Sequence, residues 1–103
     1  MIIKRNGSIE DGAVKNNIRR LLNQTFKLLP LREEESDWEK SLDSIMEELT
    51  GMDSLLIGKH EILFSLLCKL EGLYSLTKEE DFLLYRKIIF ECLTLFEELK
   101  ESF

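Results

Sequence analysis

Apolar residues return every three or four positions along most of this chain, and that spacing is the strongest constraint on its fold. The last stretch shows it most clearly, with an alternating three- and four-residue spacing through Phe82, Tyr85, Ile89, Cys92, Phe96 and Leu99. On an α-helix this spacing places all of these side chains on one face. A β-strand would turn them alternately to two opposite faces. We therefore expect an all-α protein.

Three further stretches with the same period precede this one, and short breaks separate all four. The expected helices cover residues of about 13–29, 37–50, 59–76 and 78–100. The first expected core stripe consists of Val14, Ile18, Leu21, Leu22, Thr25, Leu28 and Leu29. Short connections between amphipathic helices favour neighbours that run antiparallel. The sequence therefore predicts an antiparallel, up-and-down four-helix bundle that forms a single domain over residues 1–103.

Local signals set the expected ends of these helices. Pro30 is expected to end the first helix, because proline lacks a backbone donor and disfavours the helical conformation of the residue before it. Ser36 with Glu39, and Thr77 with Glu80, have the spacing of a capping box. These two pairs are therefore expected to begin the second and the fourth helix.

Residues 1–12 form the one segment without a helical period. Asn6-Gly7 lies between the apolar residues Ile2-Ile3 and Ile9, a pattern that is typical of a hairpin turn. A two-stranded hairpin has little stability alone. We therefore expect a short N-terminal hairpin that packs on the helices, or an extended arm.

The same segment resembles the start of a known regulatory domain. Residues 3–9 (IKRNGSI), followed by Lys15 and by residues 18–22 (IRRLL), are similar to the hairpin and helix that open an ATP-cone. ATP-cones are nucleotide-sensing regulatory domains at the head of ribonucleotide reductases and of their repressors. The resemblance covers about a quarter of the chain. It implies a nucleotide-sensing role in which Lys4 and Arg5 face the phosphates.

No pattern in the sequence indicates catalysis or a resident cofactor. The one histidine, His60, lies at the start of an expected helix, and no serine or cysteine is placed by spacing to form a catalytic group with it. The Cys and His spacings of zinc sites are missing, and so are the paired acidic motifs of di-iron and magnesium bundles and the glycine-rich loops that bind phosphate. We therefore expect no enzyme activity, metal, cofactor or small-molecule substrate.

The charge of the chain is uneven, with a basic start and an acidic body. The net charge is −6, although residues 1–30 carry six basic residues, Lys4, Arg5, Lys15, Arg19, Arg20 and Lys27. An acidic body disfavours nucleic-acid binding. Apolar runs are too short to cross a membrane, and the N-terminus lacks the apolar stretch of a secretory signal. Without a disulfide spacing pattern, Cys68 and Cys92 are expected to be buried thiols of a cytoplasmic protein.

The third and fourth expected helices carry more apolar residues than one core face needs. Phe64 and Cys68 fall outside the core face of the third helix, and Leu83 and Phe90 fall outside that of the fourth. Either other parts of the chain cover these residues or they form an interface, because large exposed apolar patches are uncommon on monomers. We predict an interface with a second copy in a homodimer or with a heterologous protein.

The sequence therefore predicts a non-catalytic, helical protein–protein interaction module. Small acidic helical proteins of this kind serve as accessory, regulatory or inhibitor proteins, some of them encoded by phages or mobile elements. Two alternatives stay open. One is the nucleotide-sensing role that the ATP-cone resemblance implies, and the other is an inhibitor whose acidic faces mimic a nucleic acid.

Overall fold

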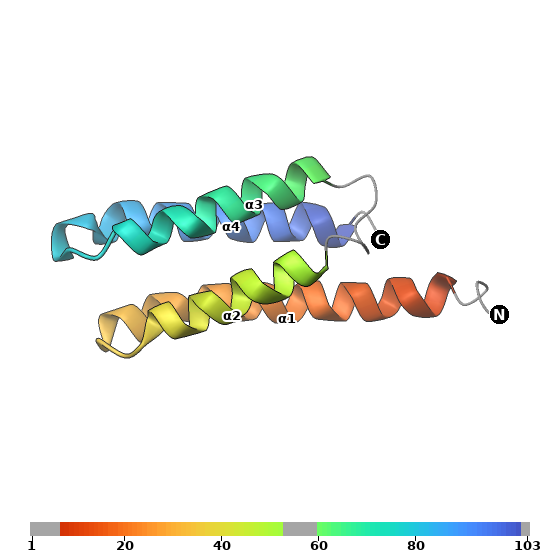
Figure 1. The fold of residues 1–103 in the computed structure, drawn as a ribbon, viewed down its shortest axis with the longest axis horizontal. Helices are drawn as coiled ribbons and strands as arrows, with labels where there is room; N and C mark the ends of the chain where they lie inside the picture. The colour runs from red at the N-terminus through yellow and green to blue at the C-terminus, as the bar shows by residue number, and fades with distance from the viewer. Residues whose placement is uncertain (1–6, 53–59, 102–103) are drawn as a thin grey trace.

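The protein is a bundle of helices that run alternately up and down (Figure 1). The structure is a computed structural model, and it describes residues 7–52 and 60–101. The α-helices in these residues are α1 (Gly7–Glu33), α2 (Trp38–Gly51), α3 (His60–Gly72) and α4 (Phe82–Glu101). This part of the chain contains no strand. The predicted all-α, antiparallel four-helix bundle is confirmed.

The helices form a closed ring of neighbours. Each helix contacts the next one along the chain, and α4 also packs against α1. Figure 1 shows α1 and α2 in one layer, with α3 and α4 in the other. In the described residues no helix combines the length and the apolar character that crossing a membrane requires.

The core consists of one apolar stripe from each helix. The predicted stripe of α1 and the predicted seam of α4 are buried, apart from Leu22 and Phe82, which are partly buried. The largest fully buried side chains include Tyr85 and Phe96. The one buried polar residue of the described core is Thr25, whose hydroxyl donates to the carbonyl oxygen of Leu21 at 2.8 Å. This bond explains how a threonine can stand in an apolar stripe without an unpaired hydroxyl group.

The helix α1 is longer at its start than the sequence predicts. It begins at Gly7, so residues 7–12 are helical and the predicted hairpin strand around Ile9 is wrong. Residues 1–6, which include the other half of the predicted hairpin, lie outside the described residues. The Asn-Gly signal for a turn is local, and here the helix that begins at the glycine prevails over it.

The same helix also continues past Pro30 to Glu33, so the predicted end at residue 29 is wrong. The end is instead set by Glu35, which has a φ of 57°. The backbone N–H of Glu35 donates to Arg32 and that of Ser36 donates to Leu31, at 3.1 and 2.9 Å. This pair of bonds is the Schellman arrangement, which ends a helix at a left-handed residue. Pro30 has no backbone N–H, so the helix loses one hydrogen bond there, but the two hydrogen bonds that end the helix do not involve this residue.

Both predicted capping residues are wrong by one position, and the predicted start of the fourth helix at residue 78 is wrong as well, because α4 begins at Phe82 after a 3-10 turn. Asp37 replaces Ser36 as the first cap, and its carboxylate accepts a backbone N–H from the first turn of α2 at 3.3 Å. Before α4, the cap is at Lys78 and not at Thr77, because the carboxylate of Asp81 accepts the backbone N–H of Lys78 at 3.3 Å. In both places an aspartate supplies the capping oxygen.

Two 3-10 turns form the corner between α3 and α4. They are η2 (Leu73–Ser75) and η3 (Glu79–Asp81). The predicted helix over residues 59–76 is therefore α3 followed by η2, and residue 59 lies outside the described residues. This corner meets the end of α1 at the same end of the bundle.

Candidate functional site

Three large apolar side chains are exposed along the contact between α1 and α4. Phe26 is 49% exposed on α1, and Leu83 and Phe90 are 76% and 40% exposed on α4. The rings of Phe26 and Phe90 meet edge to face, with their centroids 6.4 Å apart. Leu83 lies about two helical turns before Phe90 and so shares its side of α4. We call Phe26, Leu83 and Phe90 the α1–α4 patch.

Basic side chains border the α1–α4 patch. The guanidinium carbon of Arg86 lies 5.0 Å from the centroid of the Phe90 ring, which is a favourable cation–π arrangement. Lys87 is exposed one turn before Phe90 and one turn after Leu83. Lys27 lies seven residues after Arg20, which pairs with Glu48 of α2, so it is on another side of α1. The positions one turn before and after the two phenylalanines contain no acidic residue: Leu22, Asn23, Leu29, Pro30, Arg86, Lys87, Leu93 and Thr94. The basic border of the α1–α4 patch therefore consists of Arg86 and Lys87 beside Phe90. At the other end of the patch, Leu83 lines an open pocket together with Glu79 and Glu80.

The structure places the predicted interface residues of α3 on a different side of the bundle. Phe64 is 68% exposed, and Cys68 is exposed as well. Lys69 marks the side of α3 that faces α4, because its Nζ lies 3.1 Å from Oε1 of Glu91. Phe64 precedes Lys69 by five residues, which is about 140° around the helix. Phe64 therefore points away from α4, while Phe90 points towards α1.

The four residues of the predicted interface thus do not form one surface. Leu83 and Phe90 share a surface with Phe26, which the sequence analysis did not select. The signal for Phe26 was present, since it follows Thr25 and falls outside the core stripe of its helix. The criterion that selects Phe64, Leu83 and Phe90 in the two later helices would select Phe26 as well.

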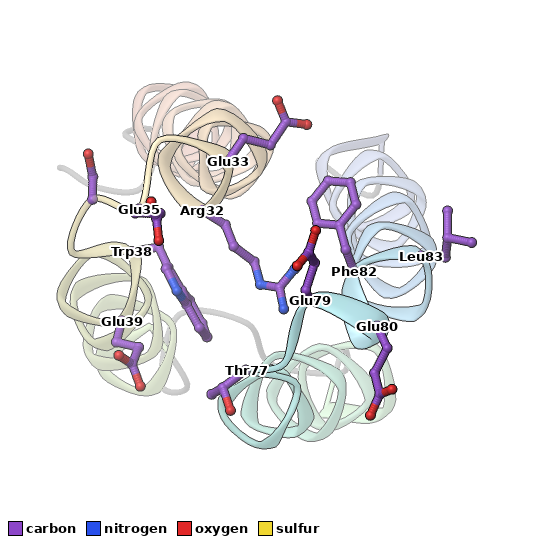
Figure 2. Close-up of a pocket in the computed structure, with 11 residues that line it drawn as sticks. Arg32, Glu33, Glu35, Trp38, Glu39, Thr77, Glu79, Glu80, Phe82 and Leu83 are labelled. Atoms are coloured by element: carbon purple, nitrogen blue, oxygen red, sulfur yellow. The ribbon is translucent and has the colours of Figure 1, made fainter.

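A second feature lies at the end of the bundle where α1 meets the α3–α4 corner. Arg32 extends from α1 into the centre of this end (Figure 2). Its Nη2 donates to the carbonyl oxygens of Leu76 and Lys78, both at 2.7 Å. Its guanidinium carbon lies 4.6 Å from the ring centroid of Tyr85 and 5.3 Å from that of Phe82. Arg32 therefore joins the last turn of α1 to both α4 and the corner that precedes it.

An open pocket of about 970 Å³ surrounds Arg32. Aromatic side chains of Trp38 and Phe82 line it, and so do the carboxylates of Glu33, Glu35, Glu39, Glu79 and Glu80 (Figure 2). The one cation in its lining is already held by the backbone carbonyls of the corner. We therefore assign Arg32 a structural role, which is to hold the bundle end together.

Tyr85 lies fully buried beside this pocket. Its ring packs edge to face on Trp38, with centroids 5.1 Å apart, and its hydroxyl has no hydrogen-bond partner within the described residues. Burial raises the pKa of Tyr85, the positive charge of Arg32 opposes that rise, and the charge of Glu39 adds to it. The phenol therefore stays neutral in the folded protein at physiological pH.

The described helices do not gather the groups that a metal site needs. They contain no cluster of three or more His, Cys, Asp or Glu side chains placed to hold a metal ion. His60 is an exposed residue at the start of α3, and Cys92 is buried in the core. Cys68 is exposed, so the prediction that both thiols are buried is wrong for this residue. Its position falls outside the core stripe of α3, which explains the exposure.

The two cysteines are expected to react at very different rates. Burial raises the pKa of the Cys92 thiol to about 12, so the thiol stays protonated and shielded at pH 8. A thiol reagent such as DTNB should therefore label one cysteine per native chain within minutes and two in urea. The variant Cys68→Ser should lose the rapid reaction. Rapid labelling of both thiols in the native protein would show that the core around Cys92 is open.

The residues that the ATP-cone resemblance assigns to phosphate binding are Lys4 and Arg5, which lie outside the described residues. The hairpin that it implies does not form over residues 7–9, which are helical. Comparisons of the chain with protein-family models, with curated proteins and with solved structures found no match. Function is therefore inferred from the surfaces of the chain itself.

Proposed function

We propose that this protein is a non-catalytic protein–protein interaction module that binds an acidic amphipathic helix through the α1–α4 patch. The observation that carries the proposal is the exposure of three large apolar side chains next to the basic residues Arg86 and Lys87. Covering such a patch removes apolar surface from water, which drives association. The charges around it select the partner and raise the rate of encounter.

The shape of the α1–α4 patch suits a helix. It lies along two antiparallel helices, and the seam between them can receive the side chains of a third helix. Leu83 and Phe90 are seven residues apart, which is about 10 Å along the axis of α4. Anchor residues at positions i and i+7 of a partner helix have the same separation.

The arrangement of the aromatic residues supports a protein partner over a nucleic acid. Single-stranded nucleic acids stack their bases on exposed faces of aromatic rings. Here the ring of Phe90 meets that of Phe26 edge to face and has Arg86 over it.

The basic border also bears on the predicted homodimer. A two-fold dimer through the α1–α4 patch would bring the same patch of two copies together. The basic residues Arg86 and Lys87 of both copies would then lie in one interface, and like charges in an interface oppose binding. An acidic partner surface is therefore favoured over a symmetric one.

Two designed helical peptides test the proposal. Both carry the same Leu and Phe stripe, and one has Glu at its flanking positions where the other has Lys. In a titration followed by NMR, we expect the Glu peptide to shift the signals of Phe26, Leu83 and Phe90. The Lys peptide should bind at least tenfold more weakly. Equal binding of both peptides, or shifts that avoid the α1–α4 patch, would overturn the proposal.

Two variants supply the matched controls. Phe90→Glu should stay folded, because the side chain is partly exposed and its replacement buries no new charge. It should weaken binding of the Glu peptide at least tenfold. Leu84→Glu places the same charge on the same helix at a residue that is 48% exposed. Leu84 lies two turns before Glu91, on the side facing α3, so this variant should bind like the unaltered protein.

A further inference from the structure

We infer that the partner helix of the α1–α4 patch carries a basic residue beyond the apolar anchor that meets Leu83, and that this residue enters the pocket at the end of the bundle. The inference rests on the proposed function and extends its site. Acidic residues between the two anchors face Arg86 and Lys87, and the basic residue faces the carboxylates of the pocket. The partner is therefore a helix whose charge changes sign along its length.

The α1–α4 patch and the pocket around Arg32 meet at Leu83. This residue is 76% exposed as part of the patch, and it also lines the pocket. Figure 2 shows Glu33 and Phe82 at the bundle end where α1 and α4 meet, with Leu83 pointing outward from α4. Glu79 lies four residues before Leu83 and lines the same pocket. A helix that lies along the patch and continues past Leu83 therefore reaches the pocket.

The carboxylates of the pocket are not paired with a cation of the described residues. Its lining holds five glutamates, all exposed, and one cation, Arg32. The guanidinium of Arg32 donates to the backbone carbonyls of Leu76 and Lys78. Lys78 borders Glu79 in a neighbouring hollow, but the ion pairs of the described residues involve neither it nor any glutamate of the pocket. A cation from a partner can therefore compensate a negative charge that the bundle leaves in place.

The opposite end of the patch differs in this respect. Glu97 follows Phe90 by seven residues and so lies on the same side of α4. Its Oε2 lies 3.1 Å from Nζ of Lys100, which compensates its charge within the chain. Arg86 and Lys87 lie between Leu83 and Phe90. Along α4 the partner therefore meets unpaired carboxylates, then two basic residues, and then a glutamate that is already paired.

A basic side chain can span the distance from the anchor to the pocket. A residue three or four positions beyond the anchor lies on the same face of the partner helix. It is displaced by about one turn, or 5.4 Å, along the axis. The aliphatic stem of a lysine or arginine can then cover apolar atoms of Leu83 and Phe82, while its charged group reaches Glu33 and Glu79. The same side chain thus uses both the apolar and the acidic parts of the lining.

Two further helical peptides test the inference. Both have two apolar anchors seven positions apart, with Glu between them. The Lys-ended peptide has Lys one turn beyond each anchor, and the Gln-ended peptide has Gln there, so that either direction along α4 presents the same ends. In titration calorimetry with the unaltered protein, the Lys-ended peptide should bind about fivefold more tightly, which is the gain from an exposed ion pair. High salt should diminish this difference.

Two double variants locate the source of the difference. Glu33→Gln combined with Glu79→Gln removes two carboxylates of the pocket and should abolish the advantage of the Lys-ended peptide. Glu47→Gln combined with Glu71→Gln removes the same charge from exposed residues of α2 and α3, and should preserve that advantage. Because both peptides are compared on each variant, a difference in their own helicity cancels. All four positions are exposed, so circular dichroism should show unaltered helical content.

An advantage that persists in the Glu33→Gln and Glu79→Gln variant would overturn the inference, and so would an advantage that Glu97→Gln abolishes. Equal binding of both peptides to the unaltered protein would overturn it as well. If the two bind equally and shift the NMR signals of Phe26, Leu83 and Phe90, the proposed function stands without this extension into the pocket. If neither peptide binds, both proposals fail.

Discussion

Arg32→Ala is expected to lower the free energy of unfolding by about 2–3 kcal/mol. Each hydrogen bond from a charged donor contributes roughly 1.5–3 kcal/mol, and Arg32 makes two, to Leu76 and Lys78. The stacking on Tyr85 and Phe82 adds to them. The expected loss of unfolding free energy is smaller than the sum of these contributions, because water can hydrogen-bond to the two carbonyl oxygens once the guanidinium is gone.

Urea unfolding of two matched variants checks this value. Arg20 lies on the same helix and pairs with Glu48 at 2.7 Å, with the two side chains 46% and 41% exposed. An exposed pair contributes about 0–1 kcal/mol, so Arg20→Ala should have little effect. Arg32→Lys should fall between the two, because lysine keeps the charge and loses the planar group that stacks and donates. Equal losses for Arg32→Ala and Arg20→Ala would show that Arg32 does not hold the bundle end.

The helical period located the core because burial of one face decides where each helix packs. Every residue of the predicted α4 seam except Phe82 is fully buried, and the predicted stripe of α1 is buried almost throughout. The ends of the helices are harder to predict, because each end depends on one or two individual hydrogen bonds. The turn beyond Pro30 is stabilised by Arg32, whose partners are 44 and 46 positions away along the chain. No local pattern carries that information.

Exposure could be predicted from the sequence, but the grouping of exposed residues could not. Phe64, Leu83 and Phe90 are exposed as their positions outside the core stripes indicate. Which of them share a surface depends on which neighbour each side of a helix faces, and this arrangement appears only in the bundle. Leu84 shows a further limit, because it lies on the side of α4 that faces α3 and is nevertheless 48% exposed.

Reversing the charge of the basic border tests the α1–α4 patch most directly. Arg86→Glu combined with Lys87→Glu changes two exposed side chains and leaves Phe26, Leu83 and Phe90 in place. Circular dichroism should show an unaltered helical content, because neither side chain is part of the core. The measurement is the affinity of this double variant for the Glu and Lys peptides. We expect the preference to reverse, with binding of the Glu peptide weakened at least tenfold and the Lys peptide now bound more tightly. Unchanged binding of the Glu peptide would contradict the claim that the basic border of the α1–α4 patch selects an acidic partner.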